Sequence, residues 1–234
     1  MNDDRFARYG AASGILTVLL VVGSFVGLIL PNAPNLDAPG ADWAAYFTGH
    51  QSRIQVGVIV LGVGLFFFVW FLGSLRSALA RAEGGEGRLA SVAFAGGIVA
   101  IATLLVAACA GAAAALRPED LDPNTTRALN DLGVVAGGPG AAGFTALFAA
   151  TAIVGYRYRA VPAPVAGFSA LAAITQPLAY GVAVTDSGVF AADGVIGGFI
   201  PIITFVIAML ALSYALIREP RGYAASASGQ AGSG

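Results

Sequence analysis

The sequence predicts an all-α membrane protein, a polytopic bundle of six transmembrane helices, and three observations lead to this prediction. Hydrophobic residues make up 57% of the 234-residue chain and charged residues only 11%, whereas ordinary soluble domains carry about 25% charged residues. The mean hydropathy is +0.80, so polar residues are too few to cover a water-exposed surface. Six apolar runs are long enough to cross the hydrocarbon layer, because a membrane-spanning helix needs about 20 apolar residues.

The six predicted spans form one domain that covers residues 1–217. Their backbone groups must be satisfied within the membrane, and the runs lack the alternation of a β-barrel, so helices are predicted. The fifth run is interrupted by "TQPLAY" and the fourth by "GGPGAAG". The predicted spans are about 9–30, 54–79, 89–116, 131–155, 163–185 and 194–217.

The first span and the segment after it can be described further. The run 9–30 ends in "PNAPNLDAPG" rather than at a small-residue cleavage site, so it is predicted to stay as a helix. Asp42 is predicted to cap a short helix, "WAAYFTGH". Trp43, Tyr46 and Phe47 fall at i, i+3 and i+4 and share one face. Such aromatic residues are typical of a membrane interface, so this short helix is expected to lie flat on the outer surface.

Arginine placement predicts the orientation of the chain, because loops on the cytoplasmic side carry an excess of positive charge. All twelve basic residues are arginine, and with the abundant alanine and glycine this is typical of a GC-rich bacterial genome. Both termini are therefore predicted to be cytoplasmic in a bacterial plasma membrane, with 218–234 as a disordered cytoplasmic tail. The inner side holds Arg5, Arg8, Arg76, Arg81, Arg88, Arg157, Arg159, Arg218 and Arg221, and the outer side holds Arg53, Arg117 and Arg127.

The chain lacks the patterns that would predict catalysis or a cofactor. It contains no H-E-x-x-H, P-loop, G-x-S-x-G or C-x-x-C pattern. One histidine and one cysteine, far apart, predict no metal site, and Cys109 is interpreted as a small buried apolar residue. The net charge of −1 gives no sign of nucleic-acid binding. We therefore expect neither an enzyme nor a cofactor.

The first candidate site is the polar start of span two, "AYFTGHQSRIQVG". It contains His50, Gln51, Arg53 and Gln55. Histidine titrates near neutral pH, so His50 is either a proton-responsive group or a polar loop residue at headgroup level.

Asp131 is the second candidate, at the outer start of span four. Charges at membrane depth tend to pair or to line a wet cavity. If spans two and four are neighbours, Arg53 can pair with Asp131. Arg127 is the competing partner, four residues earlier on the same helix. The alternatives are a structural pair or solvated end, and a charge that faces a ligand.

Helix breakers form the third candidate. Pro139 interrupts span four, Pro177 span five and Pro201 span six, all at mid-depth or in the outer half. Each proline leaves a carbonyl of the preceding turn without its partner. Gln176 adds an amide near the midplane, with Tyr180 nearby. Together these residues predict an outward-opening polar pocket between spans four, five and six, although proline and glycine are also common in membrane helices without any pocket.

Two further patterns concern packing. The run "FFFVWF" at 66–71 is interpreted as lipid-facing bulk. Small residues at four-residue spacing let helices approach closely, within the chain or between subunits. These pairs are Gly10/Gly14, Gly23/Gly27, Gly133/Gly137 and Gly194/Gly198.

The stretch from "DWAAYFTGHQ" to "RLASVAFAGG", residues 42–97, resembles uncharacterised actinobacterial multi-pass membrane proteins, and "LDPNTTRALNDLG" at 121–133 is similar to them too. The resemblance implies a bacterial plasma-membrane protein and transfers no functional residue.

The function predicted from these patterns is non-enzymatic. The chain is expected to be an accessory, scaffold or oligomer-forming membrane component. The alternative is a small-solute transporter or channel that uses the outer pocket. The expected partners are membrane lipids and a second copy or another membrane protein, and no nucleic acid.

Overall fold

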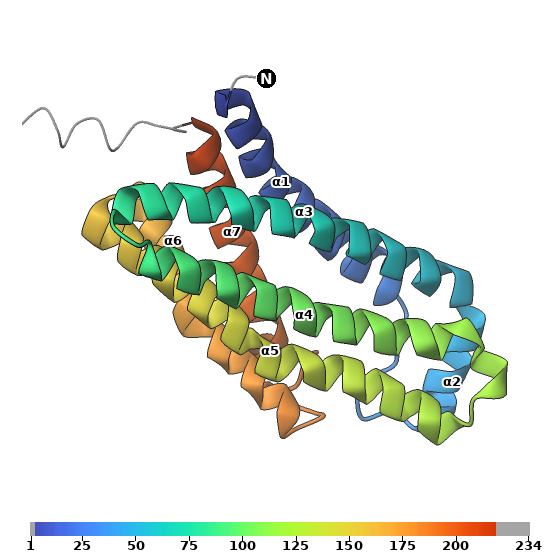
Figure 1. The fold of residues 1–234 in the computed structure, drawn as a ribbon. Coiled ribbons are helices and arrows are strands. Elements are labelled where there is room, and N and C mark those ends of the chain that lie inside the picture. Colours follow the sequence, from blue (N-terminus) through green and yellow to red (C-terminus); the bar gives the residue numbers. More distant parts are fainter. Residues whose placement is uncertain (1–2, 219–234) are drawn as a thin grey trace, which may run out of the picture.

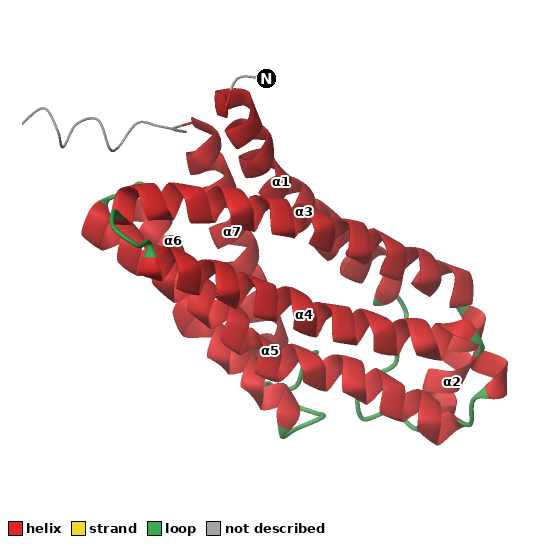
Figure 2. Ribbon diagram, viewed as in Figure 1, coloured by secondary structure: helices red, strands yellow, loops and turns green. Residues whose placement is uncertain are grey.

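A computed structural model describes residues 3–218 of the chain, with side chains from Arg8 onward. The part of the predicted tail at 219–234 lies outside the described residues. Residues 3–218 form helices and no strand, which confirms the all-α class (Figures 1 and 2). The elements are α1 (Asp3–Gly23), the π-helix η1 (Ser24–Ile29), α2 (Gly40–Gly49), α3 (Gln51–Glu83), α4 (Arg88–Leu116), the 3-10 helix η2 (Pro118–Asp120), α5 (Pro123–Tyr158), α6 (Ala163–Thr175), the 3-10 helix η3 (Gln176–Ala183), the π-helix η4 (Val195–Phe199) and α7 (Ile200–Arg218).

Six helical segments of the described chain are long and apolar enough to cross a membrane, as predicted. The fourth begins at residue 123 rather than 131 because Asp122 caps it: the Asp122 carboxylate accepts from the backbone N–H groups of Asn124 and Thr125. The segments are Arg8–Ile29, Gln51–Glu83, Arg88–Leu116, Pro123–Tyr158, Ala163–Ala183 and Val195–Arg218.

The spans form a closed ring in the order α1, α3, α4, α5, α6, α7, with α7 packed back against α1. The ring is flattened, because α3 also contacts α5 and α7 across it. The start of α1 and the end of α7 emerge at the same end (Figure 1). We call this end, with the connections 84–87 and 159–162, the turn end. The opposite end, with α2 and the connections 30–39, 117–122 and 184–194, is the α2 end.

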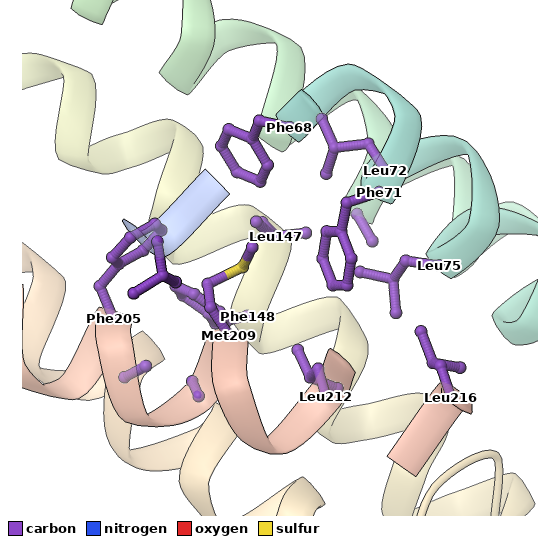
Figure 3. Close-up of a cluster of buried hydrophobic side chains, with 14 of the residues drawn as sticks. Phe68, Phe71, Leu72, Leu75, Leu147, Phe148, Phe205, Met209, Leu212 and Leu216 are labelled. Atoms are coloured by element: carbon purple, nitrogen blue, oxygen red, sulfur yellow. The ribbon is translucent and has the colours of Figure 1, made fainter. Parts of the chain in front are cut away.

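Phenylalanine side chains, together with leucine and methionine, pack at the centre of the ring of helices (Figure 3). Phe205 of α7 makes edge-to-face contacts with Phe68 of α3 and with Phe144 and Phe148 of α5, with ring centroids 5.1–6.3 Å apart. Phe68 and Phe71 are 0% exposed. These five residues are the aromatic core. The interpretation of the run at 66–71 as lipid-facing bulk is therefore wrong for Phe68 and Phe71, and it holds for Phe66 and Trp70, which are exposed.

Glycine lets α4 and α5 approach closely. A Cβ at Gly143 would lie 2.6 Å from the carbonyl oxygen of Gly96 and from the backbone nitrogen of Ala100. Backbone atoms cannot move away as a side chain can, so only glycine fits there. The predicted pair Gly10/Gly14 also packs within the chain, against side chains of α3 and α7, whereas Gly23 and Gly27 have no atom within 4 Å of a Cβ position.

At the turn end, Glu83 of α3 links this helix to the start of α4. Its two carboxylate oxygens accept from the backbone N–H groups of Leu89 (2.9 Å) and Ala90 (3.0 Å), in the first turn of α4. These N–H groups have no partner within the helix, so the carboxylate acts as an N-terminal cap. Gly84, Gly85 and Gly87 have φ values of 57–70°, which glycine adopts without the steric penalty of other residues.

Three spans depart from α-helical geometry towards the α2 end. Span one ends in η1, span five ends in η3, and span six begins with η4. The change in span five follows Gln176–Pro177, as the "TQP" interruption suggests. Pro139, in contrast, lies inside the continuous helix α5.

Large apolar side chains cover the outside of the ring. Leu19, Ile59 and Ile174 are 62%, 67% and 74% exposed. Cys109 is also exposed, so the expectation that it is buried is wrong. Contiguous apolar surface on all sides needs an apolar solvent, and with the six spans it gives the chain the structure of an integral membrane protein.

Candidate functional site: the α2 end

His50 occupies the junction between α2 and α3. Its Nδ1 lies 3.0 Å from the backbone carbonyl of Tyr46, to which a protonated Nδ1 donates, and its ring lies against the Tyr46 ring with centroids 4.9 Å apart. Groups of three or more potential metal ligands are absent from the described residues. These contacts give His50 the role of ending α2.

Four polar side chains beside His50 bond carbonyls at or just beyond the ends of other helices. Gln51 donates to Leu116 (3.2 Å) and Gln55 to Ala115 (3.1 Å), at the end of α4. Arg53 donates to the carbonyl of Pro31, in the connection after η1, and the Tyr46 hydroxyl donates to that of Ile29, the last residue of η1. The last carbonyls of a helix have no partner in the helix itself. We call Tyr46, Gln51, Arg53 and Gln55 the helix-end donors.

The aromatic face of α2 supports these donors from inside the protein. Trp43, Tyr46 and Phe47 share one face, as predicted, but they are only 4–6% exposed and pack with Ile54 of α3 and with residues of α4 and α5. The expectation that this face meets the membrane interface is therefore wrong, because neighbouring helices cover it. Asp42 does not cap α2 either, since the helix begins two residues earlier at Gly40.

Burial also sets the ionisation of the Tyr46 phenol. Removal from water raises its pKa, and the neighbouring Arg53 guanidinium opposes that rise. The phenol therefore stays neutral at physiological pH and keeps the proton that it donates to Ile29.

Asp131 pairs with Arg127, the competing partner of the sequence prediction. The Nε atom of Arg127 lies 3.8 Å from Asp131 Oδ2, and its terminal nitrogen Nη2 lies 3.8 Å from Asp186 Oδ2. Arg53 instead bonds the Pro31 carbonyl described above. Asp186 belongs to the connection after span five, more than fifty residues away along the chain, so no local pattern predicts that it joins this pair.

An open depression with a volume of about 410 Å³ surrounds this charge cluster. Its walls come from α5, from η3 and the connection after it, and from Leu36 of the first connection. A smaller depression beside it is lined by Pro139, Tyr180 and Ala183. The first is lined by Leu36, Arg127, Asp131, Val134, Val135, Val182, Ala183, Val184, Thr185 and Asp186.

Gln176 and the prolines of spans five and six lie apart from that depression. Gln176 is buried, and its amide donates to the carbonyl of Pro201 at 2.9 Å. Beside it, the hydroxyl oxygens of Thr175 and Thr204 lie 2.7 Å apart. These bonds join span five to span six directly after Thr175, where α6 ends and the 3-10 stretch with Pro177 begins.

The predicted site residues thus fall into three groups. His50, Arg53 and Gln55 lie at the helix ends beside α2. Asp131, Pro139 and Tyr180 line the two depressions. Gln176, Pro177 and Pro201 lie at the junction of spans five and six.

No family model, curated protein or solved structure matches this chain.

Proposed function

We propose that the protein is a non-catalytic structural component of a membrane, an accessory or scaffold subunit that associates with a second copy or with another membrane protein. The aromatic core is the observation that carries the proposal. Phenylalanine side chains occupy the centre of the helix bundle, where a solute path would need polar groups or water. The polar side chains near the helix breaks agree with this, because they bond the chain's own carbonyls.

Span one offers a face for association. Gly23 and Gly27 have nothing within 4 Å of their Cβ positions, and Leu19 and Val26 beside them are exposed. Small residues at this spacing let helix backbones approach closely in lipid.

Counting bleaching steps of the fluorescently labelled full chain in lipid vesicles tests the association. We expect two or more steps for the natural chain and one step for Gly27→Leu. Gly62→Leu is the matched control, because Gly62 on span two is equally unobstructed and should leave the count unchanged. A chain that stays monomeric and moves a solute across proteoliposomes would overturn the proposal.

We further propose that the turn end faces the cytoplasm of a bacterium, as the arginine distribution predicts. In a Cys109→Ala background, Glu86→Cys places a thiol at the turn end and Asp120→Cys one at the α2 end; both native residues are exposed. A membrane-impermeant maleimide added to intact cells should label the cysteine at 120 and not the one at 86. The reverse pattern would contradict this orientation.

A solute-binding or transport role is the second candidate, favoured by the depression around Arg127 and by the nearby breaks in spans five and six. In this candidate role the junction where Gln176 bonds Pro201, between the two broken spans, rearranges during transport. Gln176→Leu should then abolish flux in proteoliposomes. A folded Gln176→Leu variant with unchanged flux would remove the junction from the mechanism.

A further inference from the structure

Arg127 lies between two carboxylates and satisfies neither completely. Its nitrogens are 3.8 Å from Asp131 and from Asp186, which is ion-pair distance but too long for a hydrogen bond. One guanidinium thus faces two carboxylates, and the cluster keeps one negative charge. The Arg127 guanidinium is a cation, and its side chain holds it between the two carboxylates. Its position therefore shows where a cation can bind at the α2 end.

The walls of the depression combine apolar side chains with the charged cluster. Val134 and Val135 come from α5, Val182 and Val184 from the end of span five, and Leu36 from the first connection. Val184 is 86% exposed, so this apolar surface is open to a ligand. Apolar side chains beside a few placed charges are features that small-molecule sites combine.

The charge of the α2 end as a whole favours a positive ligand over a negative one. The α2 end carries three arginines, Arg53, Arg117 and Arg127, against eight carboxylates. An acidic surface raises the local concentration of cations and repels anions. The carboxylates are Asp37, Asp42, Glu119, Asp120, Asp122, Asp131, Asp186 and Asp193.

We propose that the depression around Arg127, Asp131 and Asp186 binds a small amphiphilic organic cation, an ammonium group on an apolar body. The ammonium group lies between the two carboxylates and displaces the Arg127 guanidinium from them. The apolar body packs against the valines of α5 and span five. This proposal needs only binding, so it stands with or without transport.

A purely structural ion pair and a ligand site predict opposite effects for one substitution. If Arg127 only ties the connection after span five to α5, Arg127→Gln loosens the depression and weakens any binding there. If Arg127 is a competing cation, the same change frees both carboxylates and strengthens the binding of an ammonium ligand.

The test uses the full chain in nanodiscs of zwitterionic lipid and the fluorescent amine dansylcadaverine as the probe. A dansyl amide without the ammonium group is the neutral control. We expect saturable binding of the amine and none of the neutral control. Loss of an exposed ion pair costs up to about fivefold in affinity, so Asp131→Asn and Asp186→Asn should each weaken binding by up to about that factor. Arg127→Gln should tighten it, and Asp193→Asn, an acid outside the depression, should leave it unchanged.

Four results would overturn the proposal: no saturable binding, equal binding of the neutral control, an unchanged affinity in the folded Asp131→Asn and Asp186→Asn variants, or a weaker affinity in Arg127→Gln. If Asp131→Asn fails to fold, Asp186→Asn decides, because Asp186 lies in a connection rather than in a span. A failure here leaves the scaffold proposal untouched, whereas amine flux would contradict the scaffold proposal and not the binding site.

Discussion

The aromatic core and the α2 end hold the spans together by different means. In the aromatic core the helices are regular, their backbone bonds are internal, and packing of phenylalanine rings joins the spans. At the α2 end the spans become π- or 3-10-helical or end, and side chains of other elements bond the freed carbonyls. The difference shows that polar residues in a membrane protein can follow the irregularities of its backbone rather than mark a solute path.

The largest expected effect tests the aromatic core. Phe68→Ala removes a fully buried ring that contacts Phe144 and Phe205. We expect a loss of about 3 kcal/mol in the free energy of unfolding, because a cavity replaces the ring. Unfolding in detergent, followed by circular dichroism, measures it. Phe66→Ala, two residues away and 57% exposed, is the control and should change stability by less than about 0.5 kcal/mol. Equal effects of the two changes would mean that Phe68 is not in the core.

The second prediction tests the close approach of α4 and α5. Gly143→Ala places a methyl group 2.6 Å from backbone atoms of α4, so the helices must separate. We expect a loss of about 2 kcal/mol. Gly137→Ala on the same helix meets no atom within 4 Å, and it should be neutral or stabilising because alanine favours a helix. Thermal unfolding of both variants in one detergent makes the comparison.

The third prediction tests the helix-end donors. Gln55→Leu removes the amide that bonds the Ala115 carbonyl and leaves that carbonyl unpaired. Interhelical hydrogen bonds in membranes are worth about 0.6 kcal/mol on average, so a loss of about that size is expected. Hydrogen exchange should rise in the last turn of α4 and stay unchanged near Phe148. Uniformly faster exchange along the chain would contradict a local role.

The smallest effect concerns the cap of α5 at Asp122. The hydroxyl and backbone N–H of Thr125 bond this carboxylate and hold its pKa below the ordinary value of 3.8. A lowered folded-state pKa means that the ionised group stabilises the fold above pH 3.8 and loses this contribution as the pH falls below that value. Asp122→Ala should therefore lower the melting temperature slightly at pH 7, and the difference from the natural chain should shrink below pH 3.8. A difference that stays constant down to pH 2 would exclude the cap as its cause.

The spans could be predicted from the sequence because their length and hydropathy need no knowledge of neighbours. The Arg127–Asp131 pair could also be predicted, since the two residues are one helical turn apart. The buried face of α3 was harder to identify, although Leu61, Leu65, Phe68, Leu72 and Leu75 recur at helical spacing. In a membrane the opposite face is also apolar, so the contrast that reveals a core in a soluble helix is missing.

The structure of the α2 end could not be predicted, because it depends on contacts between residues that are far apart in the sequence. Whether Trp43, Tyr46 and Phe47 face lipid or protein depends on where α4 ends and α5 begins, more than sixty residues later. Likewise, the position of Gln55 in the sequence is equally compatible with lining a pocket and with bonding Ala115. Only the assembled fold distinguishes these alternatives.

The short connection between α3 and α4 bears on how the chain is made. Glu83, the three glycines and the capped N–H groups all lie within residues 83–90. The residues that join the second and third spans into a pair therefore all lie within one short continuous segment. Such a helical hairpin is equipped to enter the bilayer as a unit during synthesis, before the ribosome has delivered the partners that complete the ring.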